Sequence, residues 1–104
     1  MDERRFSPRL YQPYPARVRG VDAGQQAFKE DTLIENLSTG GLYLRLARTL
    51  EEGADVSVAV RLSIGPTGPV PVLKLMARCV VVRTEPQPDG TCGVAVEFKR
   101  RRLL

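Results

Sequence analysis

The N-terminal segment carries the side chains best suited to hold an anion. Arg4 and Arg5 form a doublet, and Arg9 follows four residues after Arg5. A guanidinium presents five donors in one plane, so it can donate two hydrogen bonds at once to a phosphate or to the O6 and N7 atoms of guanine. Pro8 limits the freedom of the segment and therefore the entropy that it loses on binding. The same residues also fit a solvated basic arm.

A second group of candidate ligand-binding residues follows in Asn36-Leu37-Ser38-Thr39-Gly40-Gly41. Asn36 and Ser38 stand two residues apart at the expected end of a strand, so their side chains should point the same way. An amide and a hydroxyl so arranged can hydrogen-bond to a base edge or a phosphate, and Gly40 and Gly41 let a ligand approach the backbone. A polar hairpin turn explains the same residues, since Asn and Ser bond the local backbone and Gly supplies positive φ.

Strand patterns dominate the rest of the chain, because apolar residues alternate with polar or small ones. Val56, Val58 and Val60 are the clearest case. Six such segments with turn residues between them predict an all-β fold, a small six-stranded antiparallel barrel whose closure removes exposed edges. Strand composition alone does not separate this barrel from an OB-type or an SH3-like one. The expected strands cover residues 16–21, 32–37, 42–46, 56–62, 70–84 and 92–98.

These patterns divide the chain into three parts. Residues 1–15 are expected to form a flexible arginine-rich arm, residues 16–98 the barrel, and residues 99–104 a basic C-terminal tail. The last strand is expected to pair with the run that precedes it, as in a long-looped hairpin. No full-length helix is expected. The tail is interpreted as a solvated or frayed segment, with an electrostatic handle for an acidic partner as the alternative.

Composition bounds the classes of protein to which the chain could belong. It has 104 residues, enough for one domain, a net charge of +4, and 16 cationic residues of which all but three are arginine. No apolar stretch approaches the roughly 18 residues of a membrane span. No secretory signal is visible, so a cytoplasmic location with Cys79 and Cys92 as free thiols is expected. The chain lacks histidine, a phosphate-binding loop, metal-ligand spacing and a catalytic constellation, so we expect neither an enzyme nor a metal site.

The two motifs together resemble the signature of the PilZ domain, a bacterial module that binds cyclic di-GMP. The family pattern is Arg-x-x-x-Arg near the N-terminus, then [Asp/Asn]-x-Ser-x-x-Gly, then a closing strand of the form Gly-x-x-x-x-Phe. Arg5 and Arg9 match the first part and residues 36–41 the second. Gly93 and Phe98 match the third, so the resemblance spans residues 4 to 98.

The resemblance implies a six-stranded antiparallel barrel with the arginine arm folded over its surface and cyclic di-GMP between the arm and the turn. Carried over residue by residue, Arg5 and Arg9 would hold phosphates and guanine edges. Asn36 and Ser38 would bond a guanine, and Gly41 would permit the turn. Ligand binding would move the arm and change the surface that an unidentified downstream protein contacts.

Three further points follow from the comparison with the family pattern. Arg4 stands where the family can carry an extra arginine that favours a stacked pair of ligands, which implies two cyclic di-GMP molecules per domain. Asn36 replaces the family's Asp and so removes a charge that would repel phosphate. Many members carry a C-terminal helix, for which residues 99–104 leave no room.

Two alternative functions remain open at this point. The chain could be a PilZ-type adaptor that binds no nucleotide and acts through protein contacts, although members of that kind usually lack the arginine arm. It could also be a small-barrel nucleic-acid binder, which would need stacking aromatic residues on its strands. Only Tyr43 is expected on the outward face of a strand, and Trp is absent, so no nucleic-acid partner is expected.

Overall fold

The computed structural model describes residues 14–63 and 72–103, and these residues fold entirely as strands and turns. Arg4, Arg5 and Arg9 lie outside the described residues, as does the connection at 64–71. No helix in the described part of the chain is long and apolar enough to cross a membrane. The strands are β1 (Tyr14–Val21), β2 (Ala27–Leu37), β3 (Gly41–Leu46), β4 (Asp55–Ser63), β5 (Val72–Pro86) and β6 (Cys92–Leu103).

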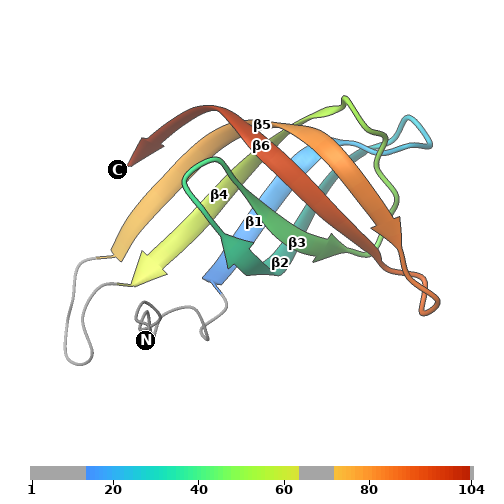
Figure 1. Ribbon diagram of the computed structural model, residues 1–104, viewed down its shortest axis with the longest axis horizontal. Helices are drawn as coiled ribbons and strands as arrows, with labels where there is room; N and C mark the ends of the chain where they lie inside the picture. The colour runs from blue at the N-terminus through green and yellow to red at the C-terminus, as the bar shows by residue number, and fades with distance from the viewer. Residues whose placement is uncertain (1–13, 64–71, 104) are drawn as a thin grey trace, which may run out of the picture.

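These strands form one closed antiparallel barrel in the order β1-β2-β3-β6-β5-β4, with β4 returning to pair with β1 (Figure 1). The architecture confirms the six-stranded antiparallel barrel expected from the sequence. The pairing of β6 with β5 confirms the expected long-looped hairpin. Closure gives each strand two neighbouring strands and so protects most of the backbone donors and acceptors that an open sheet would leave at its edges. Strands β2 and β6 each extend beyond their pairing with β3.

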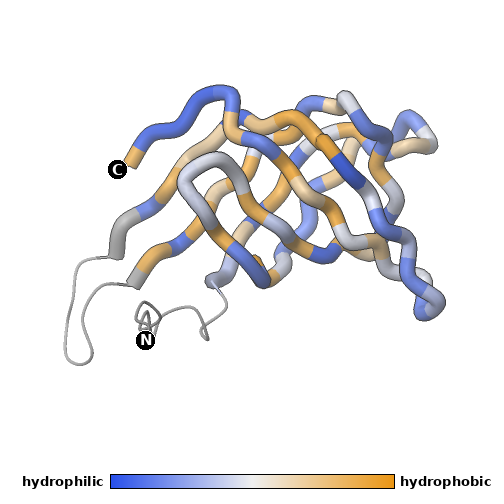
Figure 2. Tube along the Cα trace, in the orientation of Figure 1, coloured by the Kyte–Doolittle hydropathy of each residue, from blue (hydrophilic) through white to orange (hydrophobic). Residues whose placement is uncertain are grey.

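The barrel interior is filled by the apolar members of each alternating pattern. Along β4, Val56, Val58 and Val60 are buried, and the residues between them face outward because successive side chains of a strand alternate in direction. No polar or charged residue of the described chain is buried. Figure 2 shows the alternation along the strands, with a continuous hydrophilic stretch near the C-terminus. The largest fully buried side chains are Val18, Ile34, Leu44, Leu46, Leu50, Val58, Val60, Cys79, Val81, Cys92 and Val94.

The expectation that the last strand ends at Phe98 is wrong, because β6 continues to Leu103. Residues 92–97 of β6 pair with both β3 and β5, whereas its second half pairs only with the first half of β5, at residues 75–78. Residues 99–103 are exposed on both faces of the strand. Period-two hydropathy arises only where one face is buried, so this part of the strand leaves no such signal in the sequence.

Candidate functional site

The turn between β2 and β3 is built from the serine and glycines of the second motif. The Ser38 amide donates to the Gly41 carbonyl over 2.9 Å, which closes the turn. The Ser38 hydroxyl donates to the same carbonyl over 3.2 Å and accepts from the Gly40 amide over 3.4 Å. These are local side chain–backbone bonds of the kind that stabilise turns, so the interpretation of this segment as a polar hairpin turn is confirmed.

A β-bulge aims Asn36 outward at the end of β2. Ile34 is opposite Leu44 and Asn36 is opposite Tyr43, so Glu35 is the extra residue on β2. A bulge of this kind redirects the side chains that follow it. Asn36 and Ser38 are therefore both exposed at the same end of the barrel. The side-chain amide of Asn36 forms no hydrogen bond with any other residue that the structure describes.

Asn36, Ser38 and Gly41 line one shallow depression of roughly 290 Å³. Glu97 of β6 contributes a carboxylate to its wall, and Val82 of β5 contributes an exposed apolar side chain. The depression thus combines an amide, a hydroxyl, a carboxylate and an apolar surface. Those groups can accept and donate hydrogen bonds along the edge of a planar base while the apolar side chain packs against it.

The close approach of β6 requires a glycine at position 41. A Cβ on Gly41 would collide with the Val96 carbonyl oxygen, and Gly41 is buried where it pairs with Glu97. Gly40 has open space around the position of a Cβ. The expectation that these glycines supply positive φ is wrong, because among the described glycines only Gly53 and Gly90 have positive φ. The motif glycine therefore allows two strands to approach closely.

The turn is also held from the side by the second half of β6. The Phe98 amide donates to the Gly40 carbonyl over 2.9 Å, and a guanidinium nitrogen of Arg101 donates to the Thr39 carbonyl. The Arg101 guanidinium lies 5.5 Å from the centre of the Phe98 ring, within range of a cation–π contact. Arg101 was expected in a solvated tail, and no sequence signal indicated its contact with a turn 62 residues away.

Tyr43 connects β3 to the C-terminal end of β5 through a hydrogen bond to Glu85. Its hydroxyl donates to Glu85 over 2.8 Å, and Arg83 donates to the other carboxylate oxygen over 2.8 Å. The hydrogen bond from Tyr43 is the main reason that the pKa of Glu85 lies below its ordinary value, and the same bond raises the pKa of Tyr43. A Cβ on Gly93 would collide with the Tyr43 hydroxyl. Tyr43 is thus held by its neighbours and is not a free stacking surface.

Nucleophilic and metal chemistry find no support in the described residues. Burial raises the pKa of the Cys79 thiol to about 12, so the thiol stays protonated at neutral pH and is a poor nucleophile. Cys79 and Cys92 are both free and buried. No group of three or more His, Cys, Asp or Glu residues in ranges 14–63 and 72–103 is arranged to hold a metal ion.

Comparison with known proteins confirms the family resemblance that the two motifs indicate. Residues 3–103 match a family model described as the PilZ domain, which covers almost the whole chain. A comparison with curated proteins finds no significant match. The matched range includes both the turn that the structure describes and the arginine segment that precedes it.

Proposed function

Because the chain belongs to the PilZ domain family, we propose that it is a receptor for cyclic di-GMP and signals through protein contacts. In this proposal the domain is a cytoplasmic binding module without catalytic activity. The ligand lies between Arg5 and Arg9 of the arm and the depression at the β2–β3 turn, where Asn36 and Ser38 line the wall. Gly41 contributes by letting β3 approach β6, which keeps the turn beside the ligand.

The observation that carries this proposal is the place where the arm joins the barrel. Tyr14, the first residue of β1, is directly opposite Ile34 of β2, two residues before Asn36 (Figure 1). Arg9 precedes Tyr14 by five residues, a length of chain that reaches at most about 18 Å. Asn36 lies only about 7 Å along the strand from Ile34. An arm rooted at this point is long enough to bring Arg9 over the depression.

The side chains at the depression complement the two parts of the ligand. Each phosphodiester of cyclic di-GMP carries a negative charge, which guanidinium groups bind through charge-assisted hydrogen bonds. A guanine edge presents N–H donors as well as O6 and N7 acceptors, and the depression offers the Glu97 carboxylate and the Asn36 amide for them. Asn36 adds no charge, so it does not repel a phosphate as an aspartate would.

Binding would couple to signalling through the arm. In this proposal the phosphates of the ligand neutralise Arg5 and Arg9 and draw them towards the β2–β3 turn. Rearrangements of this kind remodel the surface that a partner contacts.

Isothermal calorimetry with cyclic di-GMP tests the proposal. We expect binding by the wild-type chain and a loss of about ten- to a hundredfold in affinity for Arg9→Ala, because a charge-assisted hydrogen bond contributes about 1.5–3 kcal/mol. Arg61→Ala is a matched control, since it removes an exposed arginine of β4 that does not line the depression. The stoichiometry would also show whether two ligand molecules bind, as the presence of Arg4 implies.

Two outcomes would contradict the proposal. One is the absence of heat at ligand concentrations up to about 0.1 mM, which would exclude all but very weak binding. The other is equal loss of affinity in the Arg9→Ala and Arg61→Ala variants, which would mean that only the net charge of the chain matters.

A further inference from the structure

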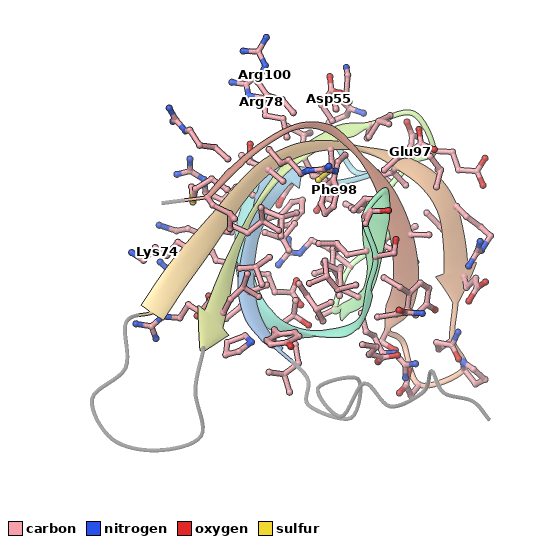
Figure 3. All side chains as sticks on the ribbon, turned by 60° about the vertical axis from the view of Figure 1, so that its left-hand side comes forward. Asp55, Lys74, Arg78, Glu97, Phe98 and Arg100 are labelled. Carbon is pink, nitrogen blue, oxygen red and sulfur yellow. The ribbon has the colours of Figure 1, made fainter. Side chains whose placement is uncertain are left out.

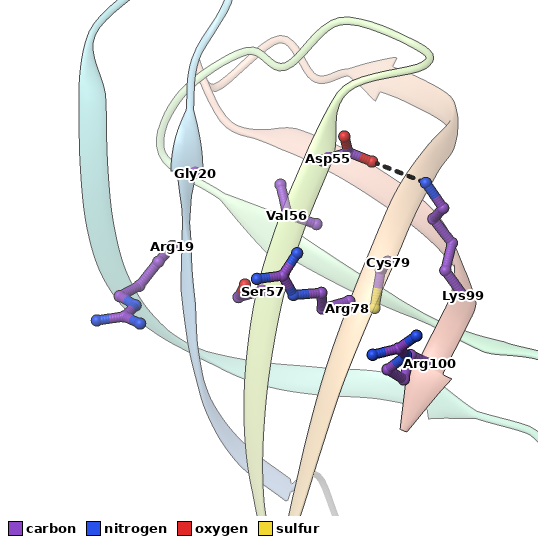
Figure 4. A pocket seen from close by; sticks show the side chains of 9 residues that line it. All are labelled: Arg19, Gly20, Asp55, Val56, Ser57, Arg78, Cys79, Lys99 and Arg100. Carbon is purple, nitrogen blue, oxygen red and sulfur yellow. Dashed lines mark hydrogen bonds and ion pairs between the residues drawn. The ribbon is translucent and has the colours of Figure 1, made fainter. Parts of the chain in front are cut away.

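A second, strongly basic surface lies on strands other than those of the turn. Two adjoining depressions, of roughly 580 and 760 Å³, open over the outer face of β4. Their linings share Arg19 of β1, Ser57 of β4, Arg78 of β5 and Arg100 of β6. In Figure 4, Arg78 extends from β5 toward Ser57, and Arg100 stands on β6 beyond it. We call this pair of depressions the basic groove.

The strand register places the cations of the basic groove in a row. Lys29 is opposite Arg19, Arg19 is opposite Ser57, and Ser57 is opposite Arg78. Arg78 is in turn opposite Arg100, and both project outward from the barrel in Figure 3. Four of the five positions across β2, β1, β4, β5 and β6 are therefore cationic. Adjacent strands lie about 4.8 Å apart, so neighbouring charges in this row are close.

No salt bridge joins Lys29, Arg19, Arg78 or Arg100 to another described residue. Asp55 lines the first depression, where it pairs with Lys99 over 3.4 Å, and Asp31, which interacts with Lys29, pairs with Arg17 over 2.7 Å. Like charges directly opposite each other on paired strands destabilise a sheet. Arg78 and Arg100 form one such pair, and Lys29 and Arg19 form another. An anionic partner would relieve this repulsion, so the basic groove is electrostatically complementary to a polyanion.

The apolar residues on the floor of the basic groove favour an acidic protein segment over a nucleic acid or a lipid surface. Beside the cationic row, Ala59 of β4 is opposite Met76 of β5, and Met76 is 38% exposed. Methionine is a deformable apolar side chain that is common at protein-binding surfaces. No aromatic side chain among the described residues lines either depression, so this surface offers no described ring on which the bases of a single-stranded nucleic acid could stack. A flat lipid surface would span the hollow without filling it.

We propose that the basic groove is a docking site for an acidic segment of a partner protein that carries an apolar residue among its carboxylates. The carboxylates pair with Arg19, Arg78 and Arg100, and the apolar side chain covers Met76. Alternate carboxylates of an extended partner segment would lie about 7 Å apart, and Arg100 and Arg102 are separated by the same distance along β6. Arg101 lines the groove and also contacts the β2–β3 turn. The cations that pair with the acidic segment are not those assigned to cyclic di-GMP, so this interaction does not require the nucleotide.

Fluorescence anisotropy with a labelled synthetic peptide of alternating glutamate and leucine tests the docking proposal. We expect the peptide to bind the wild-type chain and to lose about tenfold in affinity for the double variant Arg78→Gln/Arg100→Gln, because close charge pairs across an interface contribute this much or more. Arg45→Gln/Arg83→Gln removes the same charge outside the groove and should leave affinity unchanged. Thermal unfolding of both variants controls for loss of fold.

Three comparisons make the test decisive. Met76→Gln should weaken binding of the glutamate–leucine peptide but not of polyglutamate, which has no apolar side chain to place on the floor. A thymidine oligonucleotide and phosphatidylserine vesicles should bind less tightly than the peptide at the same ionic strength. The proposal is overturned if the peptide does not bind, if both double variants lose affinity equally, or if the oligonucleotide or vesicles bind more tightly.

Discussion

Gly41 belongs to the motif that identifies the family, yet its glycine is explained by packing. The Val96 carbonyl of β6 occupies the space that a Cβ would need, while Gly40 next to it has open space. Ser38 also has a structural task, since its hydroxyl bonds to the turn backbone. The Asn36 side chain, in contrast, forms no hydrogen bond with another described residue. The ligand specificity of the turn should therefore depend more on Asn36 than on the glycines.

The packing role of Gly41 predicts unequal effects of two alanine substitutions one residue apart. Gly41→Ala should lower the free energy of unfolding by about 1–3 kcal/mol, because strands β3 and β6 must move apart to admit the methyl group. Gly40→Ala should change it by less than about 1 kcal/mol, since nothing lies within 4 Å of the added carbon. Urea unfolding of both variants measures the difference. Equal stability of the two variants would contradict the packing explanation.

Strand β6 has two halves with different tasks. Residues 92–98 close the barrel between β3 and β5, and residues 99–103 continue along β5 alone. The second half brings Arg101 to the Thr39 carbonyl and Arg100 beside Arg78, so one strand contacts both the turn and the basic groove. A change in the position of β6 would therefore move side chains at both the turn and the basic groove, so this strand couples the two surfaces.

The link between β3 and β5 through Tyr43 and Glu85 predicts a dependence of stability on pH. The pKa of Glu85 is lowered in the folded chain from its ordinary value of 4.5, so the folded state favours the ionised carboxylate. This contribution is present above about pH 4.5 and is lost as the pH falls through the lowered pKa. Tyr43→Phe removes the largest cause of the shift, so the variant should lose less stability on acidification than the wild type.

Urea unfolding of both chains at neutral pH and at several values below about pH 4.5 measures this difference. Glu85→Gln is the complementary variant, because it keeps an acceptor for Tyr43 but cannot titrate. Its stability should also fall less than that of the wild type at low pH. Parallel pH profiles for the wild type and the Tyr43→Phe variant would show that the hydrogen bond does not couple to folding.

Considered as a whole, the barrel was predictable where burial is one-sided. Alternation such as that of Val56, Val58 and Val60 predicts which face of a strand is buried. Six alternating segments with turns between them predict the closed sheet that the structure shows. The extension of β6 was missed because both of its faces are exposed beyond Phe98. Strand ends depend on pairing partners that lie far away in the sequence, and local patterns carry no information about them.

The candidate site shows the same division between local and distant information. Asn36 and Ser38 could be identified from their motif, because the turn that holds them is local. Glu97 and Val82 come from β6 and β5, and only closure of the barrel brings them to the same depression. The basic groove was equally invisible, since Arg19, Arg78 and Arg100 become neighbours only through the register of the strands. The arginine arm was recognised from sequence and lies outside the described residues.

Mapping amide resonances by NMR during a titration with cyclic di-GMP would locate the ligand on the protein. We predict that the amides of residues 36–41 shift together with those of Arg5 and Arg9, while amides in the middle of β4 do not. The result separates the depression at the turn from the basic groove, which could also attract an anionic nucleotide. Shifts confined to β1, β4 and β5 around the groove, or no shifts at all, would contradict the account.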